Sequence, residues 1–248
     1  MSILSAYLHI MAKAAEKAAI GLVRDFGELE RLQVSKNGHS NFVTSADKNS
    51  ESRIVYELSK ARPEFSILSE ESGFIENKDK DHVWIIDPID GTNNFIRGIP
   101  SFAINIALME KGKVMSGITL DPLRGDCFKA EFGNGAFVGN RNRLRVSGRE
   151  QIAESVVSIY DGVKSEYDFM EEGAIVRRGG AIALDLAYLA AGKYDVVIAK
   201  GVSMWDIASG VILIQEAGGF IRYDKKDDGQ YDVVATSSLK LLNILDLD

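Results

Sequence analysis

Four short, mostly apolar segments follow one another between residues 102 and 138, and three turn sequences separate them. The turn sequences are Lys111-Gly112-Lys113, Pro122-Leu123-Arg124-Gly125 and Gly133-Asn134-Gly135. Connections this short that contain glycine usually join neighbouring strands as hairpins. The sequence therefore predicts a meander of antiparallel strands at Ala103–Met109, Val114–Leu120, Asp126–Glu131 and Ala136–Val138.

Helices and further strands are expected on both sides of this meander. Apolar residues recur at helical spacing in Ser5–Val23 and in Ser45–Lys60, and Ser45 and Pro63 mark the start and the end of the second helix. The other expected helices are Ile182–Ala191, Trp205–Ala217 and Ser237–Ile244. The other expected strands are Phe65–Leu68, Val83–Ile86, Val156–Tyr160, Val196–Ala199, Phe220–Tyr223 and Val233–Ala235. Because these elements alternate without a strict strand–helix–strand repeat, they favour an α+β (mixed α/β) layered fold over a barrel.

The chain contains no linker rich in Pro, Gly or Ser and no internal repeat. We therefore expect one domain spanning residues 1–248, or two tightly packed sub-domains at about residues 1–140 and 141–248. The single cysteine, Cys127, excludes an internal disulfide framework and a cysteine-rich metal site.

Charge and hydropathy narrow the classes of function. Lys and Arg number 29 against 36 for Asp and Glu, and this net charge of −7 argues against general binding to nucleic acid or to an anionic membrane. The N-terminal residues lack the apolar core of a signal peptide, and no apolar run reaches the roughly 18 residues of a membrane-spanning helix. We expect a cytoplasmic protein.

Acidic residues gather where apolar runs end or helices begin. Glu70 and Glu71 follow the run Phe65–Leu68, Asp206 opens a predicted helix, and Asp47 lies near the start of another. Ligands usually bind at strand ends in open sheets, and neighbouring carboxylates there repel one another unless cations lie between them. Hard divalent cations such as Mg²⁺ prefer oxygen ligands of this kind.

One acidic segment directly follows the apolar run Trp84-Ile85-Ile86. In it, Asp87 can bridge two metal ions with its two oxygens. Pro88 helps to turn the chain, so that Asp90 can point back to the same ion, and the Ile89 carbonyl lies between the two acids as a neutral ligand.

The next two residues suit a phosphate group. Gly91 has no Cβ to block a phosphate from the backbone, and the amides of a helical turn beginning there would bind it. Thr92 offers a hydroxyl that could orient a water. These are parts of two-metal phosphate-ester hydrolysis, but Asp-Pro-x-Asp-Gly is most often an ordinary turn, and spacing alone leaves both interpretations open.

Three groups of residues together resemble the signatures of a known family. They are Glu70-Glu71-Ser72, Trp84 to Thr92 with Asn94-Phe95, and Trp205-Asp206 with Ala208 and Gly210, followed by Glu216-Ala217-Gly218-Gly219. They resemble the inositol monophosphatase family, including its bacterial extragenic-suppressor-type members, and the similarity runs through nearly the whole chain. The resemblance implies the layered αβαβα sandwich of the Mg²⁺-dependent, Li⁺-sensitive phosphatases, assembled as a homodimer.

The same resemblance implies an activity and a cofactor. The activity is hydrolysis of inositol 1-phosphate or related sugar or polyol phosphates, by direct attack of a metal-activated water. Two or three Mg²⁺ ions are implied, with Mn²⁺ as a substitute. The implied ligands are Glu70, Asp87 and the Ile89 carbonyl for the first ion, Asp87, Asp90 and Asp206 for the second, and Glu70 for a third.

Catalytic and binding roles are implied in the same way. Asp47 and Thr92 would orient and deprotonate the attacking water, with Glu70 as the third catalytic residue. Phosphate would be bound by the backbone amides of Gly91 and Thr92. The implied supporting residues are Glu71 and Lys36.

The sequence departs from the family in the substrate pocket. Ala199, seven residues before Asp206, stands where many members carry a glutamate that binds inositol hydroxyls. An alanine cannot hydrogen-bond a hydroxyl, so only Asp90 and Asp206 remain as acceptors, and we expect a permissive sugar- or polyol-phosphate phosphatase. The alternatives within the fold are a fructose 1,6-bisphosphatase and a 3′-phosphoadenosine 5′-phosphate phosphatase.

An alternative of another class is a regulatory binding protein. Some bacterial family members that resemble this chain also act as accessory factors of the transcription machinery. A basic run could provide such a surface for a protein or for RNA, although a solvated hairpin edge is its commoner role. The run consists of Arg141, Arg143, Arg145 and Arg149.

Overall fold

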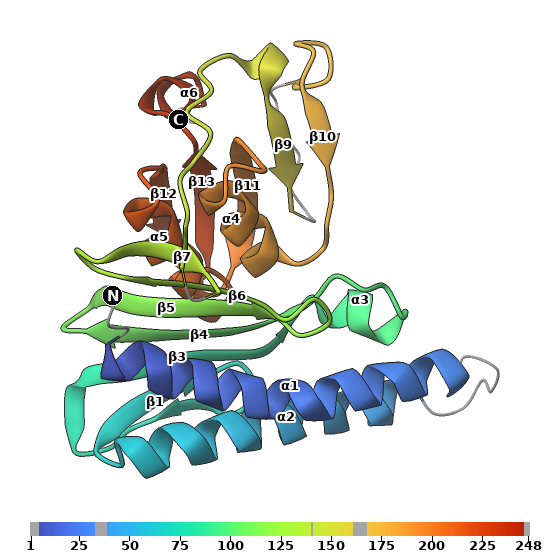
Figure 1. Ribbon diagram of the computed structural model, residues 1–248, viewed down its shortest axis with the longest axis vertical. Coiled ribbons are helices and arrows are strands. Elements are labelled where there is room, and N and C mark those ends of the chain that lie inside the picture. Colours follow the sequence, from blue (N-terminus) through green and yellow to red (C-terminus); the bar gives the residue numbers. More distant parts are fainter. Residues whose placement is uncertain (1–4, 33–38, 140, 161–167, 246–248) are drawn as a thin grey trace.

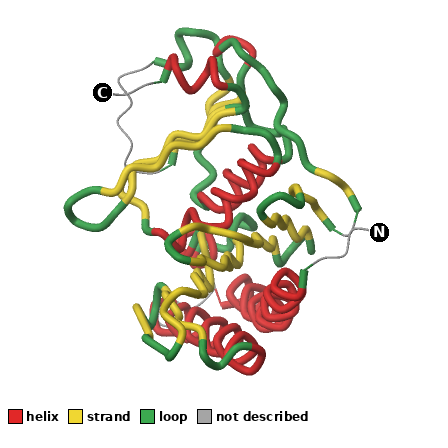
Figure 2. Tube along the Cα trace, turned by 90° about the vertical axis from the view of Figure 1, so that its left-hand side faces the viewer, coloured by secondary structure: helices red, strands yellow, loops and turns green. Residues whose placement is uncertain are grey.

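The computed structural model describes residues 5–32, 39–139, 141–160 and 168–245. In these ranges, layers of helices alternate with two sheets (Figure 1). One sheet has helices on both faces, and the second sheet lies beyond the inner helix layer (Figures 1 and 2). This is the layered αβαβα sandwich expected above. The helices are α1 (Ala6–Leu32), α2 (His39–Ala61), α3 (Thr92–Ile96), α4 (Ile182–Ala190), α5 (Met204–Glu216) and α6 (Leu239–Ile244).

The first sheet contains the predicted meander. Its strand order among the described residues is β2-β1-β3-β4-β5-β6-β7-β8, and every neighbouring pair is antiparallel except β1 and β3. Its strands are β1 (Phe65–Ser69), β2 (Gly73–Ile75), β3 (Asp79–Asp90), β4 (Ala103–Glu110), β5 (Lys113–Asp121), β6 (Asp126–Glu131), β7 (Gly135–Val138) and β8 (Asn142–Arg143).

The second sheet is built from the C-terminal half of the chain. Its order among the described residues is β10-β9-β11-β13-β12, with β9 parallel to both of its neighbours. The strands are β9 (Val156–Ile159), β10 (Ile175–Arg177), β11 (Val196–Val202), β12 (Phe220–Lys225) and β13 (Tyr231–Thr236).

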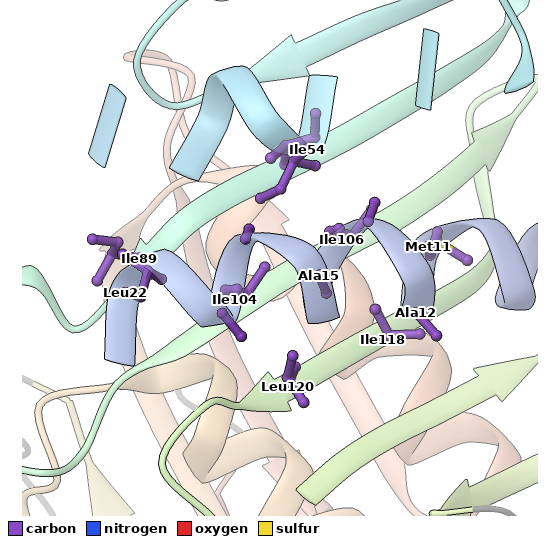
Figure 3. Packing of buried hydrophobic residues seen from close by; sticks show 14 of the residues in the cluster. Met11, Ala12, Ala15, Leu22, Ile54, Ile89, Ile104, Ile106, Ile118 and Leu120 are labelled. Carbon is purple, nitrogen blue, oxygen red and sulfur yellow. The ribbon is translucent and has the colours of Figure 1, made fainter. Parts of the chain in front are cut away.

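Small and branched apolar side chains pack α1 against the first sheet. Ala12 and Ala15 of α1 face the strands beneath, where Ile104, Ile106 and Ile118 fill the space between helix and sheet (Figure 3). All five side chains are buried. Alanine on the helix brings the helix close to the sheet, so α1 covers the face of the strands that lead to the acidic residues.

Glycine brings α5 close to the opposite face of that sheet. A Cβ on Gly117 of β5 would lie 2.8 Å from the Ser209 Cα, and one on Gly210 would lie 2.4 Å from Leu186 Cδ1 of α4. Real Cβ atoms do not approach other atoms so closely, so both positions require glycine. The helix that carries Asp206 is therefore seated tightly on the sheet that carries Asp87 and Asp90.

Several predicted boundaries differ from the structure, including the end of α1, which lies at Leu32 and not at Val23. Helix α2 begins at His39, so the prediction that Ser45 caps its start is wrong. The Ser45 hydroxyl instead accepts a hydrogen bond from the Asn49 side chain one turn later, at 3.4 Å. Strand β3 continues past Ile86 to Asp90, because its last acidic residues are buried within the sheet. No helix in the described ranges is long and apolar enough to cross a bilayer.

Candidate active site

Asp87 and Asp90 lie at the end of β3, on either side of a break in its pairing. The register of β3 against β4 shifts between these two residues, and Pro88 between them has no N–H to donate to the ladder. The Asp87 carboxylate accepts the Ile89 amide at 3.0 Å. Both acids are buried, with 1% of Asp87 and 4% of Asp90 exposed. The break brings two carboxyl groups to one strand end.

Helices from the second half of the chain complete this group. The Ala183 amide, in the first turn of α4, donates to Asp90 Oδ2 at 2.8 Å. Asp206, in the first turn of α5, accepts the Ser203 amide at 2.6 Å. These bonds hold the two carboxylates at the starts of two helices that pack against each other.

The acids act on one another electrostatically. Burial raises the pKa of Asp87 well above its ordinary value, and the nearby charges of Glu70, Asp90 and Asp206 raise it further. Burial and the charge of Asp206 do the same to the pKa of Asp90. The pKa of Asp206 rises to about 7, mainly through burial and then through Glu70. Four carboxyl groups thus share a region in which burial and like charge disfavour ionisation, while hydrogen bonds with Asp87 oppose the rise in the pKa of Glu70 and of Asp206.

Asp47 lies inside α2, two turns beyond the start of the helix, and only 5% of it is exposed. Its Oδ1 atom is buried and has no hydrogen-bond partner. Burial raises the pKa of Asp47 to about 7, and the charges of Glu71, Glu70 and Glu51 add to the shift. A buried carboxylate oxygen without a donor is a candidate position for a water or an ion that the protein itself does not supply.

The turn after Asp90 has the backbone that a phosphate site needs. Gly91 has φ of +90°, a left-handed conformation, and it directly precedes α3. The Thr92 hydroxyl donates to the Ile89 carbonyl at 3.0 Å. The first amides of a helix lack intrahelical acceptors, so this turn presents N–H groups beside the carboxylates.

A cavity of about 250 Å³ joins most of these groups. Ala199 does not line it: this residue is fully buried in β11, where it pairs with Val233. The position that counting back from Asp206 assigned to the substrate pocket therefore lies in the apolar core. Lys36 lies outside the described residues. The lining consists of Glu70, Asp87, Ile89, Asp90, Gly91, Thr92, Asn93, Tyr160, Gly180 and Asp206.

Glu51 and Tyr160 were not predicted from the sequence. Glu51 is buried on α2, and it accepts hydrogen bonds from the hydroxyls of Ser69 and Ser72. It also accepts the Glu71 amide at 3.1 Å, so it holds the loop that carries Glu70. Glu51 follows Asp47 by four residues, which places both on one helix face. The predicted helix Ser45–Lys60 already contains both acids, and this four-residue spacing is the signal that could have revealed Glu51.

A larger groove lies elsewhere, between α1 and α2, with a volume of about 740 Å³. Its lining includes Lys17, Arg24 and Arg53, and a single acid, Asp25. Lys17 already pairs with Glu57 at 2.6 Å and Arg24 with Asp25 at 2.8 Å. This groove lacks the convergent carboxylates, so the smaller acidic cavity is the candidate active site.

The donor chemistry of the acidic cavity fits Mg²⁺. Carboxylates and a free backbone carbonyl lone pair are hard oxygen ligands. The unpartnered Asp47 Oδ1 is another hard oxygen, but Asp47, like Glu71, is not among the residues that line this cavity. Among the described residues, no three or more His, Cys, Asp or Glu side chains are arranged so that they could hold a metal ion. Mg²⁺ usually retains several waters and takes only one or two carboxylates per ion, so it does not need such a cage.

The raised pKa values predict a stability that depends on pH and on Mg²⁺. A carboxyl group whose pKa rises on folding contributes stability that is complete below its unfolded pKa of 3.8 and is lost as pH rises through about 7. In EDTA, we expect the melting temperature to fall by about 4–8 °C between pH 5 and pH 8, equivalent to about 2 kcal/mol. Millimolar Mg²⁺ should remove most of that fall.

Calorimetric scans with EDTA and with Mg²⁺ measure this effect. Groups that Mg²⁺ does not affect contribute the same loss to both series, so the difference between the two series isolates the acidic cavity. Parallel curves with and without Mg²⁺ would contradict the assignment.

Comparisons with known proteins agree with this geometry. A sequence model described as the inositol monophosphatase family matches residues 4–241. An "Inositol-1-monophosphatase" of Caulobacter vibrioides is 44% identical over 94% of this chain and 94% of its own length. A "Nus factor SuhB" of Pseudomonas aeruginosa is 39% identical over 86% of this chain and 84% of its own. The crystal structure of an extragenic suppressor protein, suhB from Bartonella henselae, has a TM-score of 0.84 and 39% identity over 96% of each chain.

Proposed function

This chain belongs to the inositol monophosphatase family of phosphatases, and we propose that it hydrolyses phosphate monoesters of sugars or polyols with Mg²⁺ as cofactor. The observation that carries the proposal is a buried group of carboxyl groups, Asp87, Asp90 and Asp206, whose pKa values are raised by burial and by neighbouring negative charge. This group lines one cavity with a left-handed glycine turn. Cations would neutralise the acids, and the turn would bind the phosphate that those cations attract.

We assign the chain's own residues separate roles. Glu70, Asp87, Asp90 and Asp206, with the Ile89 carbonyl, would hold Mg²⁺. When bound, Mg²⁺ would supply positive charge to the phosphate oxygens and lower the pKa of water. The backbone amides of Gly91 and Thr92 would bind the phosphate.

The attack on phosphorus requires an oriented water. Asp47 and Thr92 would position that water, and Asp47 would receive its proton. Its buried carboxylate has an unpaired oxygen and a pKa near 7, which suits a proton acceptor at neutral pH. Glu71 would support Asp47, since its charge is the strongest of those that act on Asp47.

The rest of the cavity lining suits a permissive enzyme. Besides the acids and the phosphate turn, it adds only Asn93, Tyr160, which follows β9, and Gly180. Ala199 is buried away from the cavity. A pocket with few side chains built to bond particular hydroxyls discriminates poorly between polyols. We therefore propose a broad range of sugar and polyol phosphates, which leaves fructose 1,6-bisphosphate and 3′-phosphoadenosine 5′-phosphate as competing substrates.

Phosphate release from a substrate panel tests this proposal. With millimolar Mg²⁺ we expect release from inositol 1-phosphate, β-glycerophosphate and fructose 1,6-bisphosphate, with kcat/KM values within about a hundredfold of one another. EDTA should abolish release, Mn²⁺ should restore it in part, and Li⁺ should inhibit. No release from any substrate would overturn the enzymatic proposal, whereas a preference above that range for inositol 1-phosphate would overturn only the permissive one.

A second candidate function rests on the relatives named "Nus factor SuhB". We propose that a contact with the transcription machinery would use a surface outside the acidic cavity. In the basic run, Arg149 pairs with Asp195 at 3.4 Å, whereas Arg141 and Arg145 are exposed. Arg143 is exposed as well and lies over the Phe137 ring at 5.9 Å. We also propose that the protein assembles as a homodimer, as the resemblance to the family implies.

A further inference from the structure

Asn94 is a buried side chain beside the phosphate turn to which the proposed reaction gives no role. Its amide nitrogen donates to the Ser101 carbonyl at 2.7 Å and to the Gly179 carbonyl at 2.8 Å. Its backbone amide donates to the Gly91 carbonyl at 2.9 Å. One residue therefore joins the phosphate turn, the segment before β4 and the segment before α4.

The contacts around Asn94 leave no spare room. A Cβ on Gly180 would lie 3.0 Å from Asn94 Nδ2 and 3.1 Å from Oδ1. A Cβ on Gly91 would lie 3.0 Å from both the Ala181 Cβ and the Ser101 carbonyl oxygen. The turn and the segment before α4 thus touch directly, and the Asn94 amide fills the space between them.

These two segments form different parts of the acidic cavity. Gly91 and Thr92 line it from the first half of the chain, and Gly180 lines it from the second. The segment after Gly180 leads into α4, whose Ala183 amide holds Asp90 at 2.8 Å. A change in the spacing of the segments would therefore move the phosphate-binding amides relative to Asp90.

We propose that Asn94 is a positioning residue that locks the Gly91–Thr92 turn to the Gly179–Ala183 segment and so fixes the phosphate-binding geometry. The lock rests on these hydrogen bonds and close contacts, and its effect on phosphate rests on the proposed function. The amide suits this task because it has two N–H groups, one for each carbonyl. A carboxylate of the same shape has no N–H and would repel both carbonyl oxygens.

The test compares Asn94→Asp with a matched variant, Asn77→Asp. The Asn77 amide also donates to a backbone carbonyl, that of Phe65 at 2.7 Å, at the opposite end of β1 from Glu70. Both variants replace a carbonyl-bonded amide with a carboxylate, so both should lower the melting temperature. Asn94→Ser, which keeps one neutral donor, serves if Asn94→Asp does not fold.

Hydrogen exchange of the full chain measures the lock without relying on activity. In Asn94→Asp, we expect amide exchange to rise by at least about tenfold in residues 91–96 and residues 179–184 together. In Asn77→Asp, faster exchange should be confined to the region of Phe65 and Asn77. A fall in melting temperature without faster exchange in both segments would overturn the proposal.

Kinetics measure the consequence for phosphate. In Asn94→Asp, the KM for β-glycerophosphate and the inhibition constant of inorganic phosphate should both rise by at least about tenfold. In Asn77→Asp they should stay within about twofold. If Asn94→Asp is less stable but keeps the wild-type KM and the wild-type inhibition constant of phosphate, Asn94 has only a structural role. A wild-type chain that neither hydrolyses esters nor binds phosphate would overturn the proposed function, and the exchange data would still decide the lock.

Discussion

Replacing Asp90 with asparagine should lower kcat by about a thousandfold or more, with little loss of stability. Asp90 is buried, lines the acidic cavity and accepts the Ala183 amide. Asparagine retains an oxygen for that amide but removes the negative charge that a cation needs, and losses of this size follow removal of one such group. Steady-state phosphate release at saturating Mg²⁺ measures the effect.

The same variant should be at least as stable as the wild type in EDTA. Burial and the charge of Asp206 raise the pKa of Asp90, so an uncharged side chain relieves repulsion. Asp121→Asn is the matched control, because Asp121 is buried but is held by Arg124 at 2.7 Å, outside the cavity lining. Its activity should remain close to wild type. Activity of Asp90→Asn within tenfold of wild type would contradict the assignment of Asp90 as a metal ligand.

Asp90→Asn also separates the two candidate functions. A contact with the transcription machinery that uses another surface should survive the substitution, because the fold and the exterior are unchanged. Recovery of the same partners by both proteins would support the regulatory role beside the enzymatic one. If neither protein recovers a partner, the enzymatic role stands alone.

Replacing Gly91 with alanine should remove activity and destabilise the fold. Gly91 has φ of +90°, which costs a residue with a Cβ about 1–2 kcal/mol. The added Cβ would also lie 3.0 Å from the Ala181 Cβ and from the Ser101 carbonyl oxygen, so the turn must shift. We expect an activity loss of about a hundredfold or more, because the displaced amides no longer meet the phosphate.

Gly229→Ala isolates the conformational cost. Gly229 has a similar φ of +87°, but a Cβ there meets nothing within 4 Å. Both variants should lose the stability that a positive φ costs a residue with a Cβ. Only Gly91→Ala should lose activity, and it should lose further stability because its Cβ is crowded. Thermal unfolding and phosphate release on both proteins make the comparison. Equal activities in the two variants would show that the turn does not bind phosphate.

The meander was the most predictable part of the fold. The bounds of β6 match the prediction residue for residue, because glycines at positive φ end the strands on both sides. The start of α2 was not predictable from Ser45, because an exposed serine is tolerated inside a helix. The three-residue strands β2 and β10 have too few residues to show a period.

The candidate site was partly predictable for a related reason. Acids directly after an apolar run stand out, and Asp87 and Asp90 were found in this way. Glu51 was not found, because a glutamate inside a charged helix usually belongs to a solvent-exposed face. Only its burial and its hydrogen bonds from Ser69 and Ser72 identify it. Tyr160 joins the cavity through the packing of the second sheet, which no local pattern records.

The close packing of α5 on the first sheet has a consequence for the synthesis of the chain. The last strand of that sheet ends at Arg143, whereas the helix that covers its inner face begins only at Met204. Val83, Ile85 and Ala107 on that face pack with Ala208 of the helix. A chain leaving the ribosome therefore carries an uncovered apolar face until α5 emerges, and this nascent stage is the one at which a chaperone would bind.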